Sequence, residues 1–195
     1  MKKTLSLLFA AIFLLSVPVF SQIQRNSILV GGDIANFDLG LRKGSVFTMR
    51  IDPKLAYFIQ DNFAVGAYID LGLQTFSGTT VFDYGVGALS RYYFPDKNDQ
   101  NPLRHSRFFA EANVGITGVN VSGGGSSTNG LGIGVGPGYA YFITPNIGLE
   151  TLLKYNGLVG FGDATTQSNL NLNIGFQIYL PTRKLRTKLE SDVRQ

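Results

Sequence analysis

Apolar residues between Asn26 and Leu180 recur at every second position, not with the 3.6-residue period of a helix. The alternation is clearest in residues 169–180, where one face of an extended chain carries six apolar side chains: Leu170, Leu172, Ile174, Phe176, Ile178 and Leu180. Residues 63–74 repeat it, with Phe63, Val65 and Ile69 opposite Ala64, Tyr68 and Asp70. A period of two predicts strands with two different faces.

The pattern predicts eight strands. They span residues 27–38, 46–59, 63–74, 81–94, 107–119, 130–143, 147–156 and 169–180. Strands of globular proteins usually have about five or six residues, whereas roughly ten residues are needed for a tilted strand to cross a bilayer. Since every segment reaches that length, the predicted fold class is all-β: an eight-stranded antiparallel up-and-down transmembrane β-barrel.

The two faces differ in a way that favours a membrane barrel over a soluble one. One face is continuously aliphatic, as a lipid-facing surface should be. The other face carries Gly, Asn, Tyr and isolated charges: Asp33, Arg50, Asp52, Lys54, Asp70, Asp83, Arg91, Glu111, Glu150 and Lys154. An eight-stranded barrel is just wide enough for side chains to fill its interior. Because an unpaired buried charge is costly, we expect these ten residues to form a charge network in the lumen.

Aromatic residues cluster at one class of strand end. The clusters are Tyr57, Phe58 and Phe63; Tyr92, Tyr93 and Phe94; Phe108 and Phe109; and Tyr139, Tyr141 and Phe142. Their equivalent positions predict an aromatic girdle at one membrane interface.

The connections between the predicted strands alternate in length. Residues 60–62 and 144–146 form tight turns, whereas 39–45, 122–129 and 159–168 are longer. We assign the tight turns and both termini to the periplasm, and the longer loops to the outside, as is usual for these barrels. The connection from Pro95 to Ser106 departs from this rule, because it is long but falls on the periplasmic side.

The N-terminus has the features of a secretory leader. Lys2 and Lys3 precede an apolar run from Leu5 to Val19, and Val19-Phe20-Ser21 predicts cleavage before Gln22. The run is too short for the roughly 20 residues of a spanning anchor, and Pro18 interrupts it. We therefore expect a cleaved signal peptide (1–21), a barrel domain (22–180) in the bacterial outer membrane, and a basic periplasmic tail (181–195).

The composition argues against catalytic, metal-binding and nucleic-acid-binding functions. The chain has no Cys and one His, His105, which we interpret as a solvated turn residue, so no cofactor, metal site or enzymatic activity is expected. The net charge of +4 comes from the leader and the tail, so binding to nucleic acid is not expected. The alternating run Gly132, Gly134, Gly136 and Gly138 is interpreted as lumen-facing positions that leave room for bulky side chains, not as a phosphate loop.

Two segments carry a resemblance to a known family. Residues 55–66 (LAYFIQDNFAVG) and 140–150 (AYFITPNIGLE) both run from an aromatic residue through a short polar turn ending in Asn to an alternating strand. The phrase resembles the periplasmic hairpin of small outer-membrane β-barrel proteins, the porin-family or OmpA-like transmembrane domains common in Bacteroidetes-type bacteria. Two features depart from that family: residues 181–195 follow the last predicted strand, and we expect no peptidoglycan-binding domain after the barrel.

Two functions are compatible with such a barrel. The first is a structural role, or an interaction through an unknown extracellular ligand at the loops; the alternative is a small porin that passes solutes. The lumen charges favour the first. A soluble lipocalin-like carrier is a third interpretation, which requires the aliphatic face to point inward. The expected partners are outer-membrane lipids and the loop ligand, and we expect a monomer.

Overall fold

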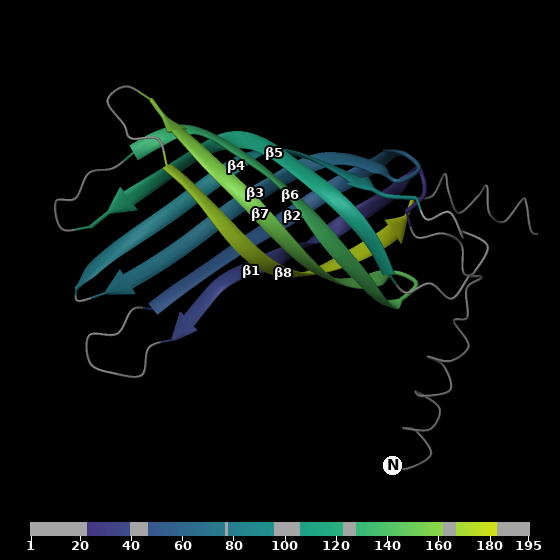
Figure 1. Cartoon of the computed structure of the whole chain (residues 1–195), viewed down its shortest axis with the longest axis horizontal. Helices are drawn as coiled ribbons and strands as arrows, with labels where there is room; N and C mark the ends of the chain where they lie inside the picture. Colours follow the sequence, from purple (N-terminus) through teal and green to yellow (C-terminus); the bar gives the residue numbers. More distant parts are fainter. Residues whose placement is uncertain are drawn as a thin grey trace, which may run out of the picture.

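The computed structural model describes residues 23–39, 47–76, 78–95, 106–122, 128–161 and 167–182. Its strands are β1 (Ser27–Leu39), β2 (Phe47–Gln60), β3 (Phe63–Phe76), β4 (Thr79–Tyr93), β5 (Ser106–Val121), β6 (Thr128–Thr144), β7 (Ile147–Gly160) and β8 (Gln167–Pro181). Each strand pairs with the next in antiparallel fashion, and β8 pairs back to β1, so the sheet closes into a barrel (Figure 1).

The predicted fold class is confirmed, and the predicted strands match the observed ones to within a few residues. The closed sheet has no free edge strand, which satisfies the backbone hydrogen bonds that a bilayer could not. No helix in the described part of the chain could cross a bilayer. The predicted signal peptide and nearly all of the predicted tail lie outside the described residues, and so does His105.

The aliphatic face points outward. Ile34, Val86, Ile116, Val135 and Leu170 are each more than half exposed. The alternate positions are buried: β6 alternates without interruption between exposed and buried residues from Asn129 to Ile143. The lipocalin-like interpretation is therefore wrong, because it requires the aliphatic side chains to be inside.

The end of the barrel where β1 begins and β8 ends contains both tight turns, and we call it the turn end (Figure 1). Here β2 and β6 each contain an irregularity in pairing, between Phe58 and Gln60 and between Phe142 and Thr144. The two segments that share a sequence phrase therefore also share a local structure. The opposite end, where β1, β5 and β7 finish, is called the loop end.

The predicted aromatic girdle is only half correct. Tyr57, Tyr92, Phe108, Tyr139 and Tyr141 point outward and are exposed at the turn end, as a girdle requires. Their immediate neighbours Phe58, Tyr93, Phe109 and Phe142 are instead fully or almost fully buried inside the barrel. Adjacent residues of a strand point to opposite faces, so one half of each pair has to face the lumen.

Candidate functional site

The ten charged residues predicted for the lumen all lie on inward-facing positions of the strands, and they divide into two groups. We call Asp33, Lys54, Arg91, Glu111 and Glu150 the inner charge layer; their charged side chains are almost completely buried. We call Arg50, Asp52, Asp70, Asp83 and Lys154 the outer charge group, which lies nearer the loop end on β2, β3, β4 and β7.

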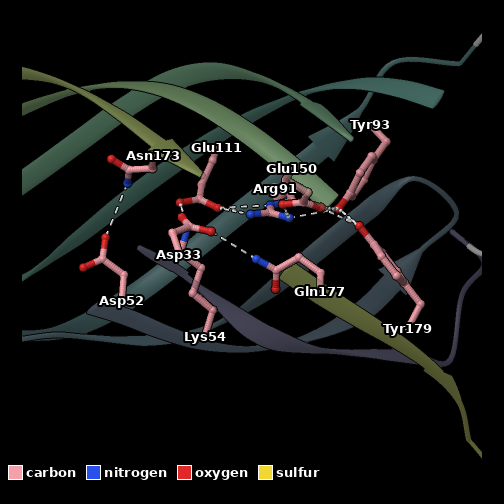
Figure 2. Close-up of polar contacts among 10 residues, drawn as sticks. All are labelled: Asp33, Asp52, Lys54, Arg91, Tyr93, Glu111, Glu150, Asn173, Gln177 and Tyr179. Atoms are coloured by element: carbon pink, nitrogen blue, oxygen red, sulfur yellow. Dashed lines mark hydrogen bonds and ion pairs between the residues drawn. The ribbon is translucent and has the colours of Figure 1, made fainter. Parts of the chain in front are cut away.

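The inner charge layer is a chain of ion pairs across the lumen (Figure 2). Lys54 Nζ binds Asp33 Oδ2 and lies 2.8 Å from Glu111 Oε1. Arg91 Nη2 lies 2.6 Å from Glu111 Oε2, and Arg91 Nη1 lies 2.6 Å from Glu150 Oε2. Residues from five strands are thus joined, and both cations have two carboxylate partners, which offsets the cost of burying them.

Two tyrosines extend this layer toward the turn end. Arg91 Nη1 donates to the Tyr93 hydroxyl at 3.0 Å, and the Tyr179 hydroxyl donates to Glu150 Oε1 at 2.7 Å. The two hydroxyl oxygens lie 2.7 Å apart. The Tyr179 hydroxyl donates to Glu150, so it is free only to accept from Tyr93, whose hydroxyl also lies 3.4 Å from Glu150 Oε1. With the bond from Arg91 to Glu150, the four side chains form a closed ring of hydrogen bonds.

An aromatic layer lies between the inner charge layer and the turn end. It consists of Phe58, Tyr93, Phe109, Phe142 and Tyr179, whose exposed fractions are between 0% and 2%. Tyr93 contacts Phe109 with ring centroids 5.4 Å apart, and Phe142 contacts Tyr179 at 5.2 Å. The Arg91 guanidinium lies over the Phe109 ring, 4.3 Å from its centroid, and so couples the charge layer to the aromatic layer.

Glycines provide the space for these side chains. A Cβ atom at Gly138 would collide with the Phe109 ring, and one at Gly175 would collide with Asp33 Oδ1. Gly132, Gly134 and Gly136 are buried on the same inward face of β6, as the interpretation of the alternating glycine run predicted.

The outer charge group is less tightly paired. Arg50 lies 3.5 Å from Asp70 and 3.0 Å from Asp83, and these three side chains are between 19% and 27% exposed. Asp52 and Lys154 are buried. Within the described residues Lys154 makes no ion pair, and its Nζ lies 5.4 Å from the centroid of the Tyr68 ring.

Sequence reasoning missed the aromatic layer although a signal for it was present. Phe58 has the same parity as Asp52 and Lys54 on its strand, Tyr93 the same as Arg91, and Phe109 the same as Glu111. Strict use of the two-residue period would have placed all three rings in the lumen. Gln177, a further inward-facing residue that the predicted charge network does not include, donates to Asp33 Oδ1 at 3.2 Å.

No group of three or more His, Asp or Glu side chains in the described strands is arranged to hold a metal ion. A closed eight-stranded barrel with an aliphatic exterior and a polar interior is the fold of the small outer-membrane β-barrels.

Comparison with solved structures finds the same fold. Neisserial surface protein A matches with a TM-score of 0.55 and 20% identity, over 78% of this chain and 95% of that protein. The N-terminal β-barrel domain of Pseudomonas aeruginosa OprF matches with a TM-score of 0.55 and 14% identity, over 80% of this chain and 98% of that domain. No protein-family model matches the chain, and no curated protein does. The outer-membrane location predicted from the sequence agrees with the fold of both structures.

Proposed function

We propose that this protein is an integral outer-membrane barrel with a plugged lumen, which acts as a structural component of the envelope or through a ligand bound at its outer loops. The proposed role is non-enzymatic. The observation that carries it is the aromatic layer: five rings on β2, β4, β5, β6 and β8 are buried across the turn end of the lumen.

The inner charge layer supports the same conclusion. A water-filled pore leaves charged side chains partly exposed, whereas the side chains of Lys54, Arg91, Glu111 and Glu150 here are 1% exposed. Opening a path for solutes would require several buried ion pairs to separate at once, and leaving one partner of such a pair uncompensated typically costs about 3–5 kcal/mol. This energy disfavours the alternative function, a small porin.

We propose the loops as the interaction site because the outward face of the barrel contacts lipid and the lumen is filled by packed side chains. At the loop end three connections are longer, 40–46, 122–127 and 161–166, and the fourth, 77–78, has two residues. At the turn end two connections have two residues, Asp61-Asn62 and Pro145-Asn146, and the third is the long segment 94–105. Most of the loop residues lie outside the described residues. The narrower assignment to porin-family or OmpA-like domains of Bacteroidetes type is also part of this proposal, and it rests on the two hairpin phrases at 55–66 and 140–150.

Cysteine labelling tests the location and the orientation together, since the chain has no native Cys. Ser122→Cys places a thiol at the loop end, and Pro145→Cys places one in an exposed turn at the turn end. In intact cells of a Gram-negative host, a membrane-impermeant maleimide should label the Ser122→Cys variant. The Pro145→Cys variant should react only after the outer membrane is permeabilised. Equal labelling of both variants in intact cells, or recovery of the protein in the soluble fraction, would contradict the proposal.

A further inference from the structure

The barrel consists of two halves that repeat one structural unit: a first half, β1–β4, and a second half, β5–β8. The hairpin of β2 and β3 recurs 84 residues later as that of β6 and β7, with Pro53 recurring as Pro137. In both hairpins the in-register pairing is interrupted at the proline and at the residue before it, since proline cannot donate to the ladder. The long connection of residues 94–105 joins the two halves.

The strands that flank the two hairpins are also placed equivalently. Asp33 of β1 and Glu111 of β5 are paired with positions of β2 and β6 that differ by 84 residues. Arg91 of β4 and Gln177 of β8 are likewise paired with positions of β3 and β7 that differ by 84 residues. Glu111 is therefore the counterpart of Asp33, and Gln177 is the counterpart of Arg91.

These counterparts make corresponding contacts between the halves. Arg91 donates to Glu111 at 2.6 Å, and Gln177 donates to Asp33 at 3.2 Å (Figure 2). The correspondence is approximate in register: Arg91 lies directly opposite Glu111, whereas Gln177 lies two residues from Gly175, the position opposite Asp33. Each half thus supplies one carboxylate and one donor, and the donor binds the carboxylate of the other half.

Two sets of counterparts meet near the middle of the lumen. Lys54 Nζ binds both Asp33 and Glu111, and the hydroxyl oxygens of Tyr93 and Tyr179 lie 2.7 Å apart. Under a two-fold rotation, a residue reaches its own counterpart only close to the axis. These contacts therefore place an approximate two-fold axis through the inner charge layer and the aromatic layer.

We propose that the lumen face of each half is an interaction surface whose partner is a four-stranded half of the same design, and that positions 91 and 177 are interchangeable cation positions in this interface. Arg91 lies between Glu111 and Glu150. An arginine in place of Gln177 would lie between Asp33, which Gln177 already contacts, and Glu150, which is diagonal to it across β7 and β8. The proposal does not depend on the role of the loops.

Moving the arginine from one position to the other tests this equivalence. The full-chain protein is refolded into zwitterionic vesicles, and the midpoint of urea unfolding is measured. Arg91→Gln should lower the midpoint, because Glu150 loses its cation. Adding Gln177→Arg should recover at least half of that loss. Adding Asn173→Arg is the control: it restores the same charge at a buried inward position of β8 whose counterpart is Gly87, and it should not recover the loss.

The yield of folded barrel gives a second readout, which applies even where Arg91→Gln alone does not fold. Adding Gln177→Arg should then restore the fraction that migrates as a compact barrel on an unheated gel, and adding Asn173→Arg should not. Two results would overturn the proposal. One is an equal recovery with both additions, which would mean that only the total charge of the lumen matters. The other is no recovery with Gln177→Arg, which would mean that the two positions are not equivalent.

Discussion

The hydroxyl oxygens of Tyr93 and Tyr179 lie 2.7 Å apart inside the turn end of the barrel, although the two residues are 86 positions apart in the sequence. Their backbones are held in the same way: Tyr93 N–H donates to the carbonyl oxygen of Asn62, and Tyr179 N–H donates to that of Asn146. Asn62 and Asn146 end the two tight turns that share a sequence phrase. The repeated hairpin therefore positions one tyrosine in each half of the barrel, and the two tyrosines meet.

The hydrogen-bond ring predicts unequal effects of removing the two hydroxyl groups. Tyr179→Phe takes away the 2.7 Å donor to buried Glu150, so it should destabilise the barrel by about 1–3 kcal/mol. Tyr93→Phe should cost less, because Glu150 then keeps its short hydrogen bond from Tyr179 at 2.7 Å as well as the one from Arg91 at 2.6 Å. Urea unfolding in lipid vesicles measures both, and the double variant should cost less than the sum of the two single changes. Additive or reversed effects would mean that the ring does not act as a unit.

Arg91 should be the most sensitive cation of the lumen. Arg91→Met leaves Glu150 without its ion pair and Glu111 with Lys54 alone, so a loss of about 3–5 kcal/mol is expected in the same unfolding assay. Arg25→Met, which removes a charge from an exposed residue, is the control and should change stability by less than about 0.5 kcal/mol. If the two variants were equally stable, the inner charge layer would not contribute to the stability of the fold.

Gly138 and Gly148 provide a matched test of packing in the lumen. A methyl group at Gly138 would collide with Phe109, whereas one at Gly148 would meet Phe142 and Tyr179 at ordinary contact distances of 3.5 Å. Gly138→Ala should therefore cost about 1–3 kcal/mol, and Gly148→Ala should be close to neutral. Combining Gly138→Ala with Phe109→Leu should recover part of the loss. An equal tolerance of both glycine changes would indicate that the rings have free space around them.

The outward face should show the depth dependence of a lipid contact. Ile174 is 60% exposed in the middle of β8, and Phe94 is 49% exposed just beyond the end of β4. Arginine at position 174 should cost about 2–4 kcal/mol, whereas arginine at position 94 should cost about 0–1 kcal/mol. Unfolding from vesicles gives both values. Equal costs would contradict the placement of the bilayer around the strands.

The strands and their faces could be predicted from the sequence because both depend on a local period of two. The lumen residues from Asp33 to Lys154 followed from the same alternation. Their ion-pair partners could not be predicted from this alternation. Lys54 and Glu111, for example, are 57 positions apart and come from strands that are not neighbours. Such pairs form across the lumen and depend on the closure of the barrel and on side-chain length. The prediction of an outward girdle was wrong for Phe58 and Phe109. It followed the clustering of aromatic residues at the strand ends, whereas the two-residue alternation of each strand places these two rings in the lumen.

Conductance of the wild-type protein in a planar lipid bilayer tests the central claim, a lumen closed by side chains, most directly. Insertion is verified with the Ser122→Cys and Pro145→Cys variants, whose thiols should be accessible from opposite sides of the membrane. The account predicts that the inserted wild-type barrel leaves the current at the baseline of the protein-free bilayer. Steady unitary currents through the inserted wild type would contradict it.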